Sequence, residues 1–295
     1  MKNLLQFNVI KILGEVFLTK NIHGKDCHLL VFTDLDGTLL DHETYSHEAA
    51  LPALKALKER NIPLILCTSK TRAEIETVRS QLQNNHPFIS ENGGAIFVPK
   101  GYFSQKFNFT REDPDYLIVE LGTPYSKLRD TVKKMRTLTQ GKVKGFGDLN
   151  FQEVAHLCGF SLDEAKLAKK REYDEPFIQE YEGHKEKIQE IANHANLKIT
   201  RGGRFYHLTG QNDKGKAVLV LKNIYRERTE KLKSIAVGDS SNDLPMLKAV
   251  DYPILVKKPD GSYDPSVKLD NIILAYGDGP AGWNDALLKL LDHLL

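Results

Sequence analysis

The sequence predicts an α/β protein with a Rossmann-like core, in which a parallel sheet has helices on both faces and an α+β domain is inserted. Three observations lead to this fold class. Short apolar runs alternate with helical segments near the start of the chain, the alternation returns near its end, and the stretch between has a different texture. Continuous apolar strands separated by helices are typical of a parallel sheet that is buried on both faces.

The first alternating region lies between residues 28 and 90. Pro63 stands at the start of an apolar run, where its missing N–H does no harm, and Pro52 is tolerated only in the first turn of a helix. Thr71 and Glu74 have the spacing of a capping box, so a helix is expected to begin there. In order, the pattern predicts a strand over 28–33, a helix over 51–60, a strand over 62–67, a helix over 71–83 and a strand over 88–90.

The alternation returns after Asp213, a residue type that is favoured as a helix N-cap. Lys214 is the first residue of the expected helix, and the later lysines Lys216 and Lys222 are expected to be solvated. The predicted elements are a helix over 214–226, a strand over 234–237, a helix over 244–249, a strand over 252–256 and a helix over 283–295.

The middle of the chain lacks this rhythm and indicates a second domain inserted into the first. It is predicted to contain helices over 126–139 and 161–171, a glycine-rich turn over 141–147 and a strand over 205–208. The division we expect is an N-terminal extension (1–27), a core domain (28–100 and 211–295) and a cap domain (101–210), with hinges near Pro99–Gly101 and Gly210–Asp213.

The N-terminal extension is moderately apolar, but Lys11, Glu15 and Lys20 interrupt or flank its apolar residues. No small-residue cleavage site follows, so a signal peptide is not expected. We expect a helical extension that packs on the body. An extended reading frame with a disordered start is the alternative.

Composition narrows the class of partner. The 295 residues contain 41 Lys and Arg and 39 Asp and Glu, so the net charge is +2. This balance gives no electrostatic footprint for nucleic acid or an anionic membrane, and no apolar run is long enough to span a bilayer. Cys27, Cys67 and Cys158 have no zinc-type or redox-type spacing, which favours free thiols and a cytoplasmic location. The expected partner is a small molecule, and monomer and homodimer both stay open.

The sequence DLDGT over 34–38 carries the strongest chemical signal, because it directly follows a predicted buried strand. The carboxyl end of a strand borders the crevice where open α/β sheets bind ligands. Asp34 can attack phosphorus and also bind a cation, while Asp36 can protonate a leaving oxygen and then activate water. The alternative is a solvated turn, since Asp-Gly is a common turn dipeptide.

Three further motifs follow in order: TSKT over 68–71, DKGK over 213–216 and GDSSND over 238–243. The first offers hydroxyl and N–H groups to a phosphate, and Lys214 in the second offers a positive charge. The third supplies further carboxylates of the kind that Mg²⁺ prefers. Taken singly, helix capping, a solvated lysine and a capped loop would explain them.

The four motifs together resemble those of the haloacid dehalogenase-like hydrolase superfamily, and the resemblance covers the chain from about residue 28. Finer marks are similar to the mannosyl-3-phosphoglycerate phosphatase family. Besides TSKT and DKGK, these marks are ENGGA over 91–95, REYDEPF over 171–177, RGGR over 201–204 with His207, and GPAGW over 279–283.

This resemblance implies a role for each residue of the core. Asp34 is the nucleophile and Asp36 the general acid and base, so the implied reaction is phosphomonoester hydrolysis through an aspartyl phosphate. Phosphate is bound by Thr68, Ser69 and Lys214. Mg²⁺ is held by Asp34, Asp36 (through its carbonyl) and Asp239, with Asp243 steadying the shell.

The implied substrate, mannosyl-3-phosphoglycerate, carries a carboxylate and a sugar as well as the phosphate; the glucosyl analogue is a possible second substrate. Arginine suits the carboxylate, because its planar fork can bind both oxygens. The arginines of the cap motifs are Arg171, Arg201 and Arg204, for each of which a surface ion pair is the alternative. The candidates for the sugar hydroxyls are Glu91, Asn92, Tyr173, Glu175 and His207.

Two other functions stay open. Another sugar-phosphate phosphatase or a phosphomannomutase-like enzyme would use the same core residues. A non-catalytic binding module that has kept the fold belongs to a different class, and the presence of both Asp34 and Asp36 argues against it.

Overall fold

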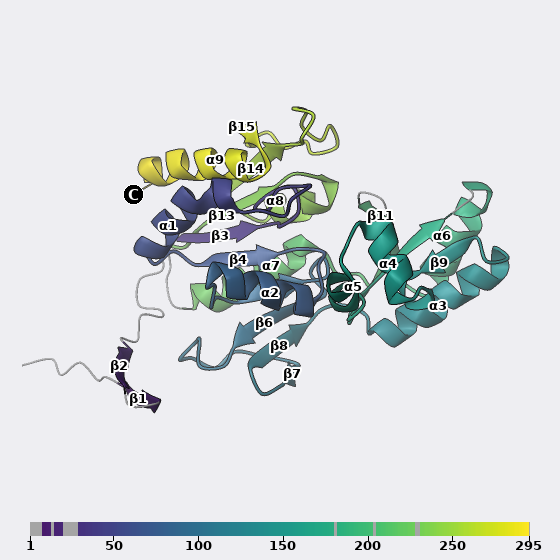
Figure 1. Cartoon of the computed structure of the whole chain (residues 1–295), viewed down its shortest axis with the longest axis horizontal. Helices are drawn as coiled ribbons and strands as arrows, with labels where there is room; N and C mark the ends of the chain where they lie inside the picture. The colour runs from purple at the N-terminus through teal and green to yellow at the C-terminus, as the bar shows by residue number, and fades with distance from the viewer. Residues whose placement is uncertain are drawn as a thin grey trace, which may run out of the picture.

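The computed structural model describes residues 8–12, 15–19, 29–179, 182–202, 205–227 and 231–294. Figure 1 shows a larger α/β part and a smaller α+β part placed side by side. The larger part contains both segments that were predicted to form the core domain, and the smaller part contains the middle of the chain.

A large mixed sheet forms the centre of the larger part. Among the described residues it has nine strands in the order β15-β14-β13-β3-β4-β5-β6-β8-β7, parallel from β15 to β5 and antiparallel beyond. In that order the strands are β15 (Ile273–Asp278), β14 (Tyr252–Lys257), β13 (Lys233–Gly238), β3 (Leu29–Thr33), β4 (Leu64–Cys67), β5 (Phe88–Ser90), β6 (Ala95–Pro99), β8 (Tyr116–Glu120) and β7 (Arg111–Glu112). The parallel half is the predicted Rossmann-like core.

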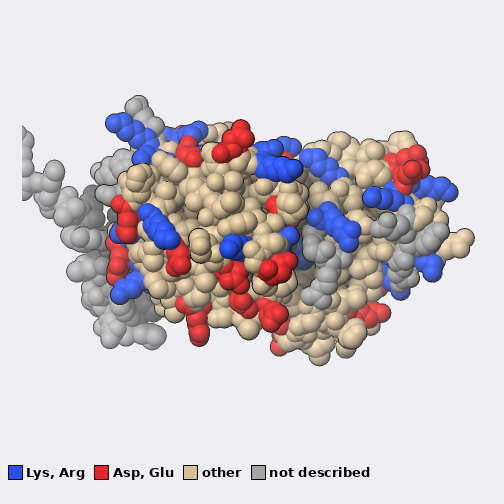
Figure 2. All heavy atoms as spheres, turned by 90° about the horizontal axis from the view of Figure 1, so that it is seen from above, with Lys and Arg blue, Asp and Glu red and all other residues tan. Residues whose placement is uncertain are grey.

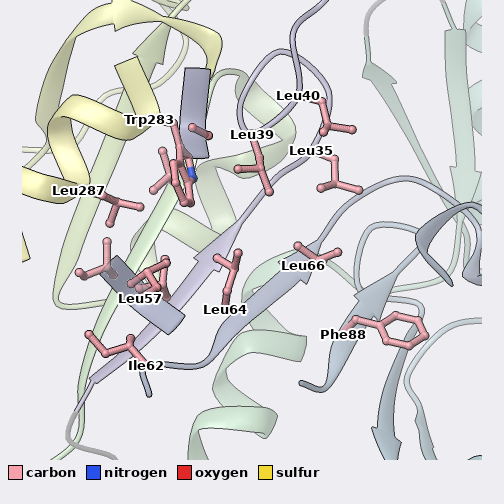
Figure 3. Close-up of a cluster of buried hydrophobic side chains, with 14 of the residues drawn as sticks. Leu35, Leu39, Leu40, Leu57, Ile62, Leu64, Leu66, Phe88, Trp283 and Leu287 are labelled. Atoms are coloured by element: carbon pink, nitrogen blue, oxygen red, sulfur yellow. The ribbon is translucent and has the colours of Figure 1, made fainter. Parts of the chain in front are cut away.

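Helices cover both faces of this sheet. Alternate residues of β3 enter different hydrophobic clusters, Leu29 and Val31 one and Leu30 and Phe32 the other, because successive side chains of a strand point to opposite faces. Figure 3 shows part of the first cluster, where Trp283 and Leu287 lie above the sheet. The first face carries η1 (Glu48–Ala50), α1 (Leu51–Glu59), α2 (Arg72–Leu82) and α9 (Gly279–Leu294), and the second carries α7 (Lys214–Arg226) and α8 (Leu244–Lys248).

The smaller part has its own sheet and its own core. Its four strands are antiparallel in the order β11-β12-β10-β9, and α3 and α6 pack their apolar faces against them. The strands are β11 (Lys198–Gly202), β12 (Phe205–Thr209), β10 (Asp174–Gln179) and β9 (Val143–Gly145). The helices are α3 (Tyr125–Leu138), η2 (Phe146–Asp148), α4 (Phe151–Cys158), α5 (Leu162–Ala168), η3 (Glu182–His184) and α6 (Lys185–His194).

The border between the two parts differs from the sequence prediction. Residues 101–120 were expected in the cap, but they extend the large sheet, because β8 pairs with β6 and β7 pairs with β8. The predicted hinge at Pro99–Gly101 therefore lies within the core, where Lys100 N–H donates to Asp115 O at 2.9 Å. The apolar run of β8 was assigned to the cap because an antiparallel extension of the sheet breaks the strand–helix rhythm. We propose that the cap runs from residue 122 to 210.

The linkers of this revised cap touch each other. A Cβ added to Gly210 would lie 2.5 Å from Thr123 Oγ1, and one added to Gly122 would lie 2.7 Å from Tyr173. A side chain at Gly210 would push the two linkers apart, and one at Gly122 would displace Tyr173. The predicted second hinge, Gly210–Asp213, coincides with one of these linkers.

The N-terminal prediction was wrong for the described residues. Instead of a helix, β1 (Asn8–Ile12) and β2 (Glu15–Thr19) form an antiparallel hairpin in which Asn8 pairs with Thr19. β1 contains valine and isoleucine, and β2 contains valine, phenylalanine and threonine, residue types that favour extended backbone.

Most other predicted elements are present, with two shifts at helix ends. The C-terminal helix begins at Gly279 rather than 283, and Pro280 occupies its first turn, where proline is tolerated. The charged helix in the cap spans Leu162–Ala168 rather than 161–171, which leaves Arg171 outside it. On the face seen in Figure 2, basic and acidic side chains are interspersed. Within the described part of the chain, no helix is long and apolar enough to cross a membrane.

Candidate active site

The two predicted catalytic carboxylates stand at the carboxyl end of β3. Asp34 follows the last residue of the strand, and its N–H donates to Val237 O of the neighbouring strand β13 at 3.0 Å. Gly37 then turns the chain with φ at +72°, and a Cβ there would approach Asp239 Oδ2 to 3.3 Å. The turn keeps Asp36 on the same side as Asp34, so both line one cleft.

Lys214 is completely buried against these carboxylates. Its Nζ donates to Asp34 Oδ1 at 2.8 Å and to Asp243 Oδ1 at 2.6 Å. Asp213 accepts the Lys216 N–H at 2.8 Å and starts the helix that aims Lys214 at the strand ends, as predicted. Burial opposes the charged ammonium, but Asp243 and Asp34 outweigh it and hold the pKa of Lys214 above its ordinary value.

The two later lysines of this helix differ from each other. Lys216 is exposed, as expected, but Lys222 is buried and donates to Ala249 O at 2.7 Å, so the prediction of a solvated Lys222 was wrong. Its position on the apolar face of α7 forces the aliphatic stem inward, and the carbonyl satisfies its ammonium.

Three carboxylates gather where a cation could bind. Oxygens of Asp34, Asp239 and Asp243 lie within 4.8 Å of one another. Burial, followed by repulsion from the neighbouring carboxylates, raises the pKa of Asp239, and burial also raises the pKa of Asp243. Crowded, mostly buried carboxylates of this kind are the donor set expected for a hard divalent cation.

Asp243 has already used both of its oxygens. Oδ1 accepts from Lys214, while Oδ2 accepts the N–H groups of Asp239 and Ser240 at 3.0 and 3.1 Å. It therefore shapes the loop that presents Asp239, which matches the steadying role implied by the resemblance. Asp36 Oδ1, by contrast, is a buried atom without a hydrogen-bond partner within the described chain.

The TSKT segment separates into three roles. Thr68 is buried and its Oγ1 accepts the Lys70 N–H at 3.4 Å, so it shapes the turn and does not line the cleft. Ser69 lines the cleft. Lys70, which the sequence argument passed over, places Nζ 2.9 Å from Asp36 Oδ2. Its position inside a recognised motif was the signal that could have revealed it.

The cleft between core and cap has a volume of about 650 Å³, within the range usual for small-molecule sites. The predicted catalytic carboxylates lie at its core side, and aromatic side chains from the cap form part of its wall. The charged, polar and aromatic residues that line the cleft and could contact a ligand include Asp34, Asp36, Ser69, Lys70, Asn92, Phe146, Phe160, Arg171, Arg201, Phe205, His207 and Asp239.

Four of the predicted substrate ligands line this cleft: Asn92, Arg171, Arg201 and His207. His207 Nδ1 forms a hydrogen bond of 2.8 Å with Asp174 Oδ2. The other ring nitrogen, Nε2, is its second polar atom. The Arg201 guanidinium lies 5.5 Å from the centroid of the Tyr206 ring. Arg171 is more constrained, because it donates to Ser69 O at 2.8 Å and to Ala168 O at 2.7 Å.

Three other predicted ligands lie outside the cleft lining: Glu91, Tyr173 and Glu175. Glu91 accepts the N–H groups of residues 172, 173 and 174, and burial raises the pKa of its carboxyl to about 8. The Tyr173 hydroxyl donates to Glu120 Oε1 at 2.6 Å. Glu175 accepts from Arg129 at 2.5 Å and from the Tyr125 hydroxyl at 2.6 Å. Arg204 lies outside the described residues.

Comparisons of the sequence with known proteins agree with this geometry. A family model described as haloacid dehalogenase-like hydrolase matches residues 31–261. A glucosyl-3-phosphoglycerate/mannosyl-3-phosphoglycerate phosphatase from Methanococcoides burtonii is 53% identical over 263 residues, covering 89% of this chain and 97% of the relative. A mannosyl-3-phosphoglycerate phosphatase from Pyrococcus horikoshii is 37% identical over 227 residues, covering 77% of this chain and 90% of the relative.

Solved structures match the whole arrangement of core and cap. A phosphatase of the haloalkanoate (HAD) enzyme superfamily from Bacteroides thetaiotaomicron superposes with a TM-score of 0.62 at 17% identity, covering 92% of this chain and 96% of that one. The sucrose-phosphatase from Synechocystis superposes with a TM-score of 0.56 at 13% identity, covering 90% of this chain and 97% of that one. The chain therefore belongs to the haloacid dehalogenase-like hydrolases and, within them, to the family of the mannosyl-3-phosphoglycerate phosphatases.

Proposed function

We propose that this protein is a Mg²⁺-dependent phosphatase that hydrolyses mannosyl-3-phosphoglycerate, and the glucosyl analogue as a second substrate, to the glycosylglycerate and phosphate. The observation that carries the proposal is the pair Asp34 and Asp36 in one cleft, the first held by Lys214 and the second by Lys70. The names of the relatives with 53% and 37% identity support the substrate.

In the first step, a carboxylate oxygen of Asp34 attacks phosphorus while the bond from phosphorus to the ester oxygen breaks. Asp36 gives its proton to that oxygen, so the glycosylglycerate leaves as a neutral alcohol group. In the second step, Asp36 takes a proton from water, whose oxygen attacks the phosphorus and restores the Asp34 carboxylate. Ser69 and Lys214 bind the phosphate oxygens, and Thr68 keeps the Ser69 turn in shape.

The residues fit a magnesium ion. Asp34 and Asp239 would hold it together with the Asp36 carbonyl, and Asp243 would keep Asp239 in place. Burial and the neighbouring carboxylates raise the pKa of Asp239, and a positive charge bound among these carboxylates would favour their ionised forms. When bound, the ion offsets the repulsion between the phosphate and the attacking carboxylate.

The rest of the substrate faces the cap. Arg201 is the candidate for the glycerate carboxylate, because it lines the cleft and its guanidinium lies beside the Tyr206 ring. Arg171 supports the phosphate loop through its bond to Ser69 O. Asn92 and His207 offer polar atoms to sugar hydroxyls, and Phe146 and Phe205 offer ring faces and edges to the apolar side of the sugar.

The test is phosphate release from mannosyl-3-phosphoglycerate, its glucosyl analogue, mannose 6-phosphate and glucose 6-phosphate, compared by kcat/KM. We expect the two glycosyl phosphoglycerates to exceed the hexose phosphates by about tenfold, because the ion pair of their carboxylate with the exposed Arg201 is worth about 1.5 kcal/mol. Arg201→Gln should lower this preference and leave hexose phosphate turnover unchanged. Equal turnover of all four esters would contradict the proposed substrate, and an isomerised sugar phosphate without free phosphate would indicate a mutase.

A further inference from the structure

Lys70 stands beside the predicted general acid although the chemistry described above gives it no role. Its Nζ lies 2.9 Å from Asp36 Oδ2 and 3.8 Å from Glu74 Oε1, and the side chain is nine-tenths buried. At these distances the lysine ammonium holds one oxygen of Asp36 and is itself held by Glu74.

Two aromatic rings enclose the same ammonium, one from each domain. Nζ lies 5.1 Å from the ring centroid of Tyr45, which belongs to the core, and 5.8 Å from that of Phe160, which belongs to the cap. The two rings meet edge to face with centroids 6.2 Å apart. Ring faces attract cations at these distances, so a cap residue completes the binding site of the Lys70 ammonium.

We propose that Lys70 is the positioning residue of Asp36 and that Phe160 fixes Lys70 when the cap is closed, so that closure orients the general acid. This inference rests on the proposed phosphatase function and names how that site is controlled. Lys70 holds Asp36 Oδ2 in place and leaves Oδ1, which has no other partner among the described residues, to serve the leaving oxygen. With the cap open, Lys70 loses one of its two rings and Asp36 loses part of its orientation.

The alternative role for Lys70 is direct binding of the substrate carboxylate. The two roles differ in what they make the enzyme sensitive to. A positioning residue changes how strongly the rate depends on the leaving group, whatever else the ester carries. A carboxylate ligand changes the rate only for esters that carry a carboxylate.

The experiment therefore uses two aryl esters without sugar or carboxylate, 4-nitrophenyl phosphate and phenyl phosphate. The 4-nitrophenolate ion is a weak base and leaves without a proton from a general acid. The phenolate ion is a stronger base, so its departure depends more on proton donation. The ratio of their kcat/KM values reports how much proton donation assists departure of the leaving group. Because both esters are measured with the same enzyme, a loss of folded protein cancels in the ratio. It is measured whether or not the glycosyl phosphoglycerates prove to be the substrates.

In Lys70→Met we expect the ratio to shift about tenfold against phenyl phosphate, a fraction of the full effect of a general acid. Lys70→Arg keeps the charge and should recover most of it. Phe160→Leu should shift the ratio in the same direction by about threefold, because one cation–ring contact is lost. The matched control is Phe151→Leu, since Phe151 is also a cap residue with a lysine 5.8 Å from its ring but does not line the cleft.

The last arm repeats Lys70→Met in an Asp36→Asn background. If Lys70 acts through Asp36, the second substitution adds no further shift of the ratio, as a double-mutant cycle requires for one shared function. An unchanged ratio in Lys70→Met, an equal response in Phe160→Leu and Phe151→Leu, or a full Lys70→Met shift that persists in the Asp36→Asn background would each overturn the proposal.

Discussion

Replacing Lys214 by methionine tests whether one buried cation holds the catalytic carboxylates together. The substitution roughly keeps the volume of the side chain and removes its charge. It breaks two bonds, 2.8 Å to Asp34 and 2.6 Å to Asp243, and leaves three carboxylates whose oxygens lie within 4.8 Å of one another. A hydrogen bond to a charged group is worth about 1.5–3 kcal/mol, and breaking a buried ion pair costs about 3–5 kcal/mol.

We therefore expect Lys214→Met to lower the free energy of unfolding by about 4 kcal/mol at pH 7 in the absence of divalent cations. The same change makes the site more negative, so the variant should gain more from Mg²⁺ than the wild type does. A tenfold gain in Mg²⁺ affinity would recover about 1.4 kcal/mol of the loss at saturation. Urea unfolding with and without Mg²⁺, followed by circular dichroism, measures both quantities.

Lys222→Met is the matched control, because Lys222 is a buried lysine of the same helix. It donates to Ala249 O at 2.7 Å and lies 3.8 Å from Asp251, a half-exposed carboxylate far from the strand ends that carry the site. Its loss should cost about 1–2 kcal/mol, with no Mg²⁺-dependent recovery. The reasoning fails if Lys214→Met costs less than about 1 kcal/mol or if Mg²⁺ rescues the two variants equally.

Three other predictions address the chemistry and the cap. Asp34→Asn should keep the fold and abolish turnover, because an amide does not attack phosphorus; residual activity in the purified variant would contradict the nucleophile assignment. EDTA should abolish phosphate release and Mg²⁺ should restore it, and full activity after exhaustive chelation would exclude the metal role. Although burial opposes it, the Arg129 guanidinium and the Gly145 N–H hold the pKa of Asp148 below its ordinary value, so its ionised form stabilises the cap above about pH 4 and this contribution is lost as pH falls below that. The loss of Tm in Asp148→Asn should therefore be large at pH 7, corresponding to about 2 kcal/mol, and smaller at pH 3, whereas a pH-independent loss would refute the charge argument.

The core could be predicted from the sequence because its chemistry is tied to its strands. Asp34, Ser69 and Asp239 each come one or two residues after a buried apolar run, and parallel strands bring their carboxyl ends to one edge. The sequence also predicted the start of α7 at Lys214, since the Asp213 cap is a local signal. Such features depend on residues that are neighbours in the sequence, so they can be predicted without knowledge of the tertiary structure.

The border of the cap could not be predicted in the same way. β6 and β8 pair antiparallel, and nothing in their local sequence says whether they extend the large sheet or open a new one. Lys70 was missed for a related reason. A lysine inside a polar loop looks solvated, and its burial depends on Phe160, which lies in another domain and about ninety residues along the chain.

Several residues of the family-like motifs hold the cap against the core and do not line the cleft. Glu91 was predicted to bind the sugar as part of the ENGGA motif, yet its carboxylate accepts the N–H groups of residues 172, 173 and 174, where the chain enters β10. Buried N–H groups require an acceptor, so this position needs a carboxylate whatever the substrate is. Tyr173 likewise fills the space left by Gly94 and Gly122, where any Cβ would come within 2.7 Å of it. Because these side chains hold the cap against the core through their polar atoms, we expect selection among substrates to depend on residues that line the cleft, Asn92, Arg201 and His207.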